Sequence, residues 1–341
     1  MRLVSIAALL LLLGSYTVVR AQDSPDTAPI LRLNASLVLT DVLVEDRATH
    51  QAVGPLTAED LIVREDGVAQ QIQYLTRDTL PLSIVFLFDL TETVQPVLKP
   101  LGASARTVLD QLRPQDEAAV MVFYSTTKLL QPFTLDHALL AQAIEKASTT
   151  SASEATFLNE DVFQATDVVR QATVPDSRRV LLFLTDGTSN TPNPAMKKIF
   201  GKSAPERLHT EPEAMNALLR SGAAASALIQ RSALSDLDTA TRILLPVGPM
   251  HLGGDPGDIR KYAERSGGII LHSNNQDVAV RMAELIDEMR SRYTLGYHPS
   301  ATQPDGKFCR ITLEPTPHFY STHPGLTPKM LILHSKSGYF R

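Results

Sequence analysis

The stretch that decides the fold reads Leu82-Ser83-Ile84-Val85-Phe86-Leu87-Phe88-Asp89-Leu90-Thr91-Glu92-Thr93. Its first part is apolar and follows Pro81, a pattern typical of a strand buried on both faces. Apolar residues then recur at helical spacing, which predicts a helix directly after the polar loop. These residues are Val97, Leu98, Leu101, Ala105, Val108, Leu109 and Leu112. The stretch therefore predicts a strand, a polar loop and a helix, in that order.

The polar loop places an acid and two hydroxyls at alternate positions: Asp89, Thr91 and Thr93. In open α/β sheets, ligands bind outside the carboxyl ends of the strands, which is where this loop is expected to lie. Side chains that offer only oxygen atoms suit a hard divalent cation better than a soft metal. The residues thus predict a crevice that holds a metal ion.

Working outward, apolar strands alternate with amphipathic helices through residues 81–290. The expected strands after the first are residues 118–123, 179–184, 223–229 and 269–271. The expected helices after the first are residues 136–147, 158–169, 212–221, 255–266 and 278–289. Such alternation is typical of a doubly wound, mainly parallel α/β sheet.

The segments on both sides of this region have β character. Residues 31–80 are expected to form a small antiparallel β unit, with Asp66-Gly67 as a hairpin turn. Residues 291–341 contain further short strand patterns. The two flanks either fold separately or pack together as one accessory β domain with the α/β region inserted, and the pattern leaves both arrangements open.

The amino terminus is expected to be a signal peptide rather than part of the fold. Residues 1–21 have a positive start, an apolar run and small residues before a cut near Ala21-Gln22. Residues 22–30 follow as a flexible leader. These features predict a secreted or periplasmic protein with no membrane span after cleavage, and a retained anchor is the alternative. Cys309 is the sole cysteine, so stability must come from a packed core rather than an internal disulfide.

Composition excludes one class of partner. The chain has 341 residues, a formal net charge of −5, 43% hydrophobic residues and 20% charged residues, as in ordinary globular proteins. Acids and bases are interspersed, and the sequence has no basic stripe of the kind that binds nucleic acid.

Three separated loops together resemble the metal-ion-dependent adhesion site of von Willebrand factor type A (VWA) domains. That family's pattern is D-x-S-x-S, then a Thr, then an Asp in T-D-G, and it matches Asp89, Thr91 and Thr93, then Thr156, then Asp186. Residues 121–130 and 262–268 also look like this family, and the resemblance covers residues 82–290. The flanks are similar to those of acidobacterial-type VWA-related exported proteins. Two departures are the threonines in place of the usual serines, and Glu92, where the family usually has a small residue.

The resemblance implies coordination chemistry rather than catalysis. Thr91 and Thr93 would bind Mg²⁺ (or Mn²⁺ or Ca²⁺) through their hydroxyls, and Thr156 would bind directly or through water. Asp89 and Asp186 would balance the charge of the cation. In the family a partner's carboxylate often completes the coordination shell, so the implied ligand is a protein or peptide with an acidic side chain. The sequence does not define the oligomeric state.

The alternatives to a metal-dependent binding protein belong to three classes. A haloacid-dehalogenase-like phosphatase would use Asp89 as a nucleophile, but its loop requires a second acid where Thr91 stands. A structural or assembly protein with a degenerate metal site is the other alternative. A Ser-His-Asp hydrolase is disfavoured because the sequence has no G-x-S-x-G elbow. The polar insertion 188–211 adjoins Asp186 and is the expected specificity loop.

Overall fold

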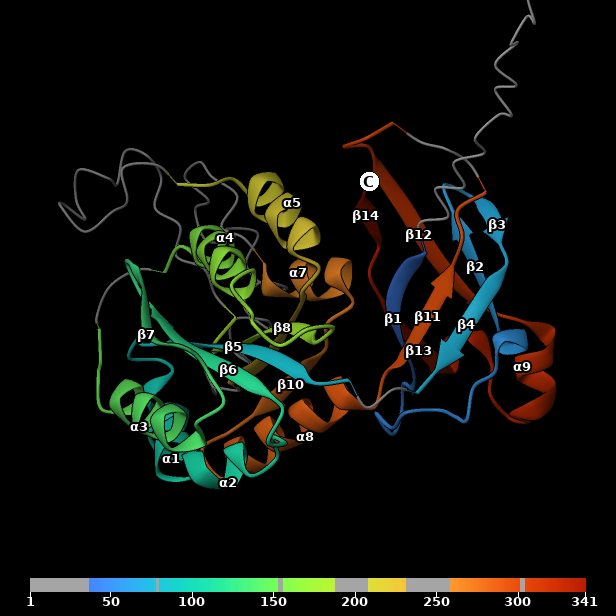
Figure 1. Ribbon diagram of the computed structural model, residues 1–341. Helices are drawn as coiled ribbons and strands as arrows, with labels where there is room; N and C mark the ends of the chain where they lie inside the picture. Colours follow the sequence, from blue (N-terminus) through green and yellow to red (C-terminus); the bar gives the residue numbers. More distant parts are fainter. Residues whose placement is uncertain (1–36, 78–79, 153–155, 188–207, 231–257, 301–303) are drawn as a thin grey trace, which may run out of the picture. The chain divides into compact units, whose positions relative to one another are not determined.

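The strand β5 lies in the middle of a six-stranded sheet with the order β10-β9-β8-β5-β6-β7 (Figure 1). The strands are β5 (Leu82–Asp89), β6 (Glu117–Phe123), β7 (Thr127–Thr134), β8 (Arg178–Thr185), β9 (Ala224–Gln230) and β10 (Ile270–Ser273). All neighbouring pairs are parallel except β6–β7, which is antiparallel. Numbered within the sheet, this is the 3-2-1-4-5-6 order of doubly wound folds. The predicted α/β class is therefore confirmed.

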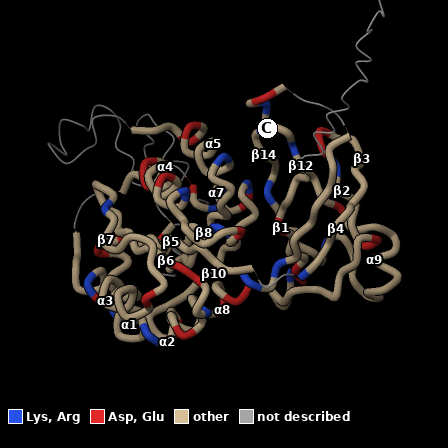
Figure 2. Tube along the Cα trace, viewed as in Figure 1, with Lys and Arg blue, Asp and Glu red and all other residues tan. Residues whose placement is uncertain are grey.

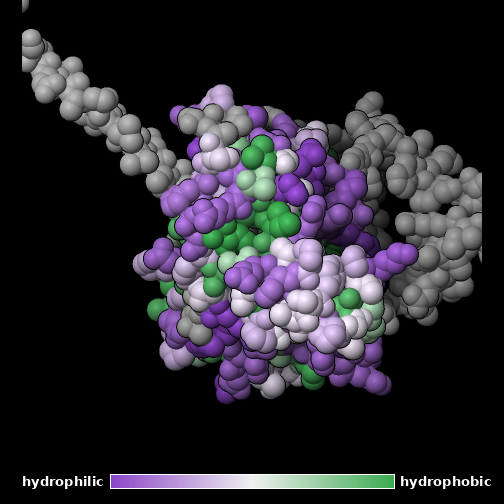
Figure 3. All heavy atoms as spheres, turned by 90° about the vertical axis from the view of Figure 1, so that its right-hand side faces the viewer, coloured by the Kyte–Doolittle hydropathy of each residue, from purple (hydrophilic) through white to green (hydrophobic). Residues whose placement is uncertain are grey.

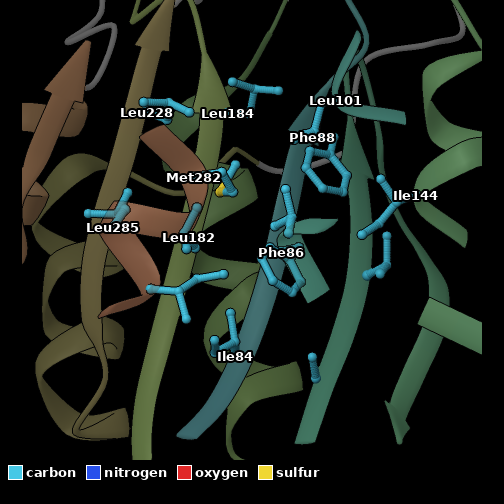
Figure 4. Close-up of a cluster of buried hydrophobic side chains, with 14 of the residues drawn as sticks. Ile84, Phe86, Phe88, Leu101, Ile144, Leu182, Leu184, Leu228, Met282 and Leu285 are labelled. Atoms are coloured by element: carbon cyan, nitrogen blue, oxygen red, sulfur yellow. The ribbon is translucent and has the colours of Figure 1, made fainter. Parts of the chain in front are cut away.

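Helices cover both faces of this sheet (Figure 1). One face packs against α1 (Gln95–Ala103), α2 (Ala105–Leu109), α3 (His137–Ser148) and α8 (Val278–Arg290). The other face packs against α4 (Leu158–Val169), α5 (Glu211–Ser221) and α7 (Ile259–Ser266). Alternate residues of β5 serve the two faces: Ile84, Phe86 and Phe88 point into the first core (Figure 4), and Val85 and Leu87 into the second. Burial of both faces explains why β5 reads as a continuous apolar run.

The helix boundaries follow local chemistry. Thr210 and Glu213 form a reciprocal capping box at the start of α5, and Gly222 ends the helix in a left-handed conformation with φ 73°. The sequence predicts one helix over residues 97–112, whereas the structure breaks it at Ser104 into α1 and α2. Pro100 lacks the N–H that a continuous helix requires near this break.

The flanking strands form two four-stranded sheets, with the orders β13-β1-β11-β4 and β14-β12-β2-β3. From the amino-terminal flank come β1 (Val38–Asp46), β2 (Leu61–Glu65), β3 (Val68–Gln70) and β4 (Ile72–Thr76). From the carboxyl-terminal flank come β11 (Tyr293–Tyr297), β12 (Phe308–Pro315), β13 (Leu331–Ser335) and β14 (Gly338–Phe340). Each sheet thus combines strands from both ends of the chain. The amino-terminal strands differ from the expected self-contained unit, because β11 lies between β1 and β4.

The structure confirms the predicted Asp66-Gly67 turn but also contains short helices that the sequence did not predict. The Asp66-Gly67 turn joins β2 to β3, and both residues have positive φ, as this tight hairpin requires. The helix α9 (Pro317–Thr322) and the 3₁₀ turns Ala58–Asp60 and Pro328–Met330 are not apparent in the sequence pattern. Cys309 is buried in β12, as expected for a packing residue.

The structure is a computed structural model that describes residues 37–77, 80–152, 156–187, 208–230, 258–300 and 304–341. The predicted signal peptide, the leader and most of the insertion 188–211 lie outside these ranges. Within them, no helix has the length and apolar character needed to cross a membrane.

Figure 2 shows acidic and basic residues interspersed along the described chain. Figure 3 shows hydrophobic residues gathered on part of one face. On the sheet that contains β11, the exposed side chains of Leu37, Leu39 and Tyr74 surround Gly296.

Candidate metal centre

Asp89 ends β5 and is fully buried. Its Oδ1 accepts hydrogen bonds from the Thr91 backbone N–H at 2.9 Å and from Thr91 Oγ1 at 2.7 Å. Its Oδ2 accepts a hydrogen bond from Thr185 Oγ1 at 3.1 Å, at the end of the neighbouring strand β8. The carboxylate is thus fixed by hydroxyl and amide donors from two adjacent strand ends.

A continuous chain of polar contacts joins this acid to Asp186. Thr91 Oγ1 lies 3.1 Å from Thr93 Oγ1, and Thr93 Oγ1 donates to Asp186 Oδ2 at 2.6 Å. The loops after β5 and β8 therefore meet at the carboxyl edge of the sheet. Hydrogen-bond contacts between side chains bring together four of the five predicted site residues: Asp89, Thr91, Thr93 and Asp186.

The contact between the two threonines has an unusual proton balance. Each hydroxyl has one proton, and both protons are directed to carboxylates, from Thr91 to Asp89 and from Thr93 to Asp186. When both carboxylates are ionised and accept these protons, the two hydroxyl oxygens face each other at 3.1 Å with their lone pairs. A cation would satisfy both oxygens at once.

The spacing of these oxygens suits Mg²⁺. With Mg–O distances of about 2.0–2.1 Å, adjacent oxygens of an octahedral shell lie about 2.9–3.0 Å apart. The hydroxyl–hydroxyl distance of 3.1 Å is close to this value. In the described part of the chain, no group of three or more His, Cys, Asp or Glu side chains is arranged to hold a metal. A cation here would thus depend on the hydroxyls, with the carboxylates orienting them.

The fifth predicted residue, Thr156, is buried immediately before α4. Phe157, the N-cap residue of α4, follows Thr156 and provides no side-chain cap. Glu92 is exposed in the loop after β5.

No protein-family model matches the chain, and no curated protein matches it. Among solved structures, the chain is similar to the conserved hypothetical protein BatB from Bacteroides thetaiotaomicron, with 16% identity and a TM-score of 0.39 over 61% of this chain and 98% of that chain. The vWF domain of the type V pili tip protein Mfa5 from Porphyromonas gingivalis gives 12% identity and a TM-score of 0.41, covering 62% of this chain and 96% of that chain. A von Willebrand factor type A protein from Catenulispora acidiphila gives 11% identity and a TM-score of 0.44, covering 89% of this chain and 74% of that chain.

The strand order, the antiparallel β7 at the edge and the positions of the motif loops decide the fold. In these features the α/β domain resembles von Willebrand factor type A domains. Within this doubly wound fold, the motif residues lie at the carboxyl ends of β5 and β8, the two strands at the centre of the sheet. This edge is the ligand-binding edge of doubly wound sheets in general.

The electrostatics of the site disfavour negative charge in the metal-free state. Burial raises the pKa of Asp89 from 3.8 to about 7; the negative charge of Asp186 adds to this, and hydrogen bonds from Thr91 and Thr185 oppose it. A buried acid with no cationic partner is costly to ionise. A bound cation would reverse this effect.

Sequence reasoning missed Thr185 as a contributor to the site, and it also missed the buried acid Asp161. Thr185 belongs to the T-D-G motif, yet only the structure shows its hydroxyl on Asp89 and its acceptance of the Gly187 N–H at 3.1 Å. Asp161, in the first turn of α4, is 1% exposed, and its Oδ1 accepts a hydrogen bond from Thr127 Oγ1 at 2.6 Å. The run Leu158-Asn159-Glu160-Asp161-Val162 contains the only local signal, an acid on the apolar side of a helix.

Proposed function

We propose that the chain is an exported VWA-type binding protein whose Mg²⁺ (or Mn²⁺ or Ca²⁺) centre recognises an acidic side chain of a protein or peptide. The observation that supports this best is the pair of hydroxyl oxygens, Thr91 Oγ1 and Thr93 Oγ1, which lie 3.1 Å apart and each contact a carboxylate. Both hydroxyls are held by carboxylates, so that their lone pairs are available together.

Each residue of the centre then has a distinct role. Thr91 and Thr93 would hold the cation through their hydroxyl oxygens, and Asp89 and Asp186 would keep those hydroxyls oriented while neutralising charge. Thr156 would contribute directly or through water. When bound, the cation supplies an open coordination position for a carboxylate of the partner. Recognition would therefore depend on the cation.

The site favours binding over catalysis. A phosphatase of the haloacid-dehalogenase type needs an accessible nucleophilic acid, whereas Asp89 is fully buried and both its oxygens accept hydrogen bonds. The position two residues later is Thr91, which is not an effective general acid near neutral pH. These features support the proposal that the protein is not an enzyme.

The test is calorimetric titration of Mg²⁺ into the protein after treatment with EDTA. The wild type is expected to bind Mg²⁺, and Asp89→Ala to lose detectable binding, because it removes the acceptor that orients Thr91. Asp167→Ala is the matched control, since Asp167 is an exposed acid of α4 that pairs with Arg170. Equal Mg²⁺ affinity of the wild type and Asp89→Ala would contradict the proposal.

The alternative is a structural or assembly protein with a degenerate metal site, supported by the two sheets that join both ends of the chain. Light scattering of the purified protein with Mg²⁺ and with EDTA separates the two functions. Association that is unchanged by EDTA, together with an absence of Mg²⁺ binding, would favour the assembly role. Fractionation of the producing cells shows whether the protein is in the periplasm or outside the cell.

A further inference from the structure

Asp161 is a buried acid that the metal centre described above does not include. One of its oxygens, Oδ1, accepts the hydrogen bond from Thr127. The other oxygen, Oδ2, is buried and has no hydrogen-bond partner among the described residues. A buried polar atom without a hydrogen-bond partner is unfavourable. A donor from outside the polypeptide would satisfy Oδ2.

The register of the central sheet places this acid on the face of Asp89. Asp89 pairs with Phe123 of β6, and Phe123 pairs with Thr127 of β7. Residues paired across a sheet lie on the same face, with adjacent strands about 4.7–4.9 Å apart. Thr127, which holds Asp161, is therefore two strands away from Asp89.

The helix α4 covers this same face. Phe123 packs in the hydrophobic cluster that contains Leu158 and Val162 of α4, and Val85 and Leu87 of β5 belong to it too. Because side chains alternate along a strand, Asp89 faces the same side as Leu87. Figure 1 shows α4 over this side of the sheet.

Electrostatics agree with the register. Burial raises the pKa of Asp161 well above its ordinary value, and the negative charge of Asp89 raises it further. Glu160 contributes in the same direction, while the hydrogen bond from Thr127 opposes it. The negative charges of the two buried acids, Asp89 and Asp161, therefore repel each other.

We propose that Asp161 is a positioning residue of the metal centre, whose Oδ2 accepts a hydrogen bond from water in the hydration shell of the bound cation. This inference rests on the proposed function of the same site. Mg²⁺ in proteins keeps several of its waters, and acceptors for those waters affect affinity although they do not touch the metal. The role through water also agrees with the absence of a direct three-acid cluster among the described residues.

The test compares Asp161→Asn with Glu160→Gln in the full chain. Glu160 is the neighbouring buried acid, but it contacts His209 at 2.7 Å and Gln164 at 2.8 Å instead of Thr127. Asp161→Asn is expected to weaken Mg²⁺ binding about 10-fold in calorimetry, which is the lower end of the range for acceptors around metal ligands. Both variants remove one negative charge from α4. Because Glu160 does not contact Thr127, Glu160→Gln is expected to change the Mg²⁺ affinity less than about 3-fold.

A second measurement distinguishes positioning from a purely structural role. In EDTA, Asp161→Asn is expected to raise the melting temperature by about 2–4 °C, because it removes a buried acid with no cation beside it. A structural role of the carboxylate predicts a lower melting temperature instead. A variant at Thr127 provides independent support: Thr127→Ala is expected to weaken Mg²⁺ binding, and Thr127→Ser to restore it.

The outcomes separate the two proposals. If Asp161→Asn binds Mg²⁺ as tightly as the wild type while Asp89→Ala does not bind, the role of Asp161 is wrong and the proposed function stands. If the wild type does not bind Mg²⁺, both proposals fail. A drop in both Mg²⁺ affinity and metal-free melting temperature for Asp161→Asn would also overturn the positioning role.

Discussion

Buried acids occur at both ends of the central sheet, but they have different partners. At the amino end, Asp116 receives the guanidinium of Arg290 at 2.6 Å and the backbone N–H groups of Leu82 and Arg113 at 2.8 and 2.7 Å. Glu117 accepts hydrogen bonds from the backbone N–H groups of Thr173 and Val174. These acids are satisfied within the polypeptide.

At the carboxyl end, neither Asp89 nor Asp161 pairs with a cationic side chain among the described residues. Their donors are the hydroxyls of Thr91, Thr185 and Thr127 and one backbone N–H. Burial raises the pKa of both acids. At the amino end burial acts in the same direction on Glu117, but hydrogen bonds from Val174, Thr173 and Ser83 outweigh it and lower its pKa.

The difference separates acids that are satisfied within the polypeptide from acids that are costly to ionise. A buried ion pair or a set of N–H donors makes an acid part of the folded structure. Asp89 has hydroxyl donors and one backbone N–H but no cationic partner, so its ionisation without a cation destabilises the folded state. This contrast supports the proposal that the carboxyl end is the functional end of the sheet.

Breaking the amino-end pair is expected to have the largest effect. Arg290→Met leaves the buried carboxylate of Asp116 without its guanidinium and is expected to lower the free energy of unfolding by about 3–5 kcal/mol. Urea denaturation measures this change. Arg281→Met in the same helix is the control: its pair with Glu284 is exposed, so its loss is expected to cost no more than about 1 kcal/mol. Equal costs for the two variants would remove the contrast between the ends.

A pH series sharpens the comparison, because the two ends should have opposite slopes. The folded protein holds the proton of Asp89 up to about pH 7, whereas the unfolded chain releases it near pH 3.8. The contribution of Asp89 to stability therefore declines as pH rises from about 4 to 7 and is constant above that. In EDTA, Asp89→Asn is expected to be more stable than the wild type at pH 8, by on the order of 1–3 kcal/mol, and equal to it near pH 4.

Glu117→Gln is the matched variant at the opposite end. Since the pKa of Glu117 is lowered in the folded state, its stabilisation is present above pH 4.5 and is lost as pH falls. Glu117→Gln is thus expected to be less stable than the wild type at pH 7, with the difference closing in acid. Chemical denaturation across pH 4–8 checks both variants, and slopes of the same sign would contradict the comparison.

The smallest effect is expected at the exposed hydroxyl of the site. Thr93→Ser retains the oxygen that donates to Asp186 and is expected to keep the Mg²⁺ affinity within about 3-fold. Thr93→Val keeps the volume but removes the oxygen, so an affinity loss of about 10-fold or more is expected. Calorimetry measures both affinities, and the melting temperature in EDTA should not change, because Thr93 is exposed. Similar affinities of the two variants would exclude a role for this hydroxyl.

Much of the α/β domain could be predicted from local pattern. The apolar run that ends at Asp89 becomes the central strand, and the carboxyl-end loops after β5 and β8 meet through Thr93 and Asp186. Pattern succeeds here because a strand buried on both faces must be apolar throughout, and parallel strands align their carboxyl ends at one edge. The D-x-T-x-T and T-D-G motifs therefore predicted that these two loops meet at one edge of the sheet.

The sequence pattern did not predict which distant strands pair with each other. The short strand β11 pairs with β1 on one side and β4 on the other, although more than two hundred residues separate them in the chain. Alternation along a strand defines a face and not a partner, so the amino-terminal strands looked self-contained. Likewise, nothing around Asp161 in the sequence shows that its side chain faces the sheet beside Thr127.

The sequence by itself determined the α/β class, the order of its central elements and the chemical types at the site, because hydrophobic periodicity and oxygen donors are local properties. Only the tertiary structure decided which acids are neutralised and which are not. Burial, strand register and the position of each Arg depend on contacts between residues far apart in the chain. That is why Asp116 has a guanidinium partner and Asp89 has none, although both are buried acids at an end of the same sheet.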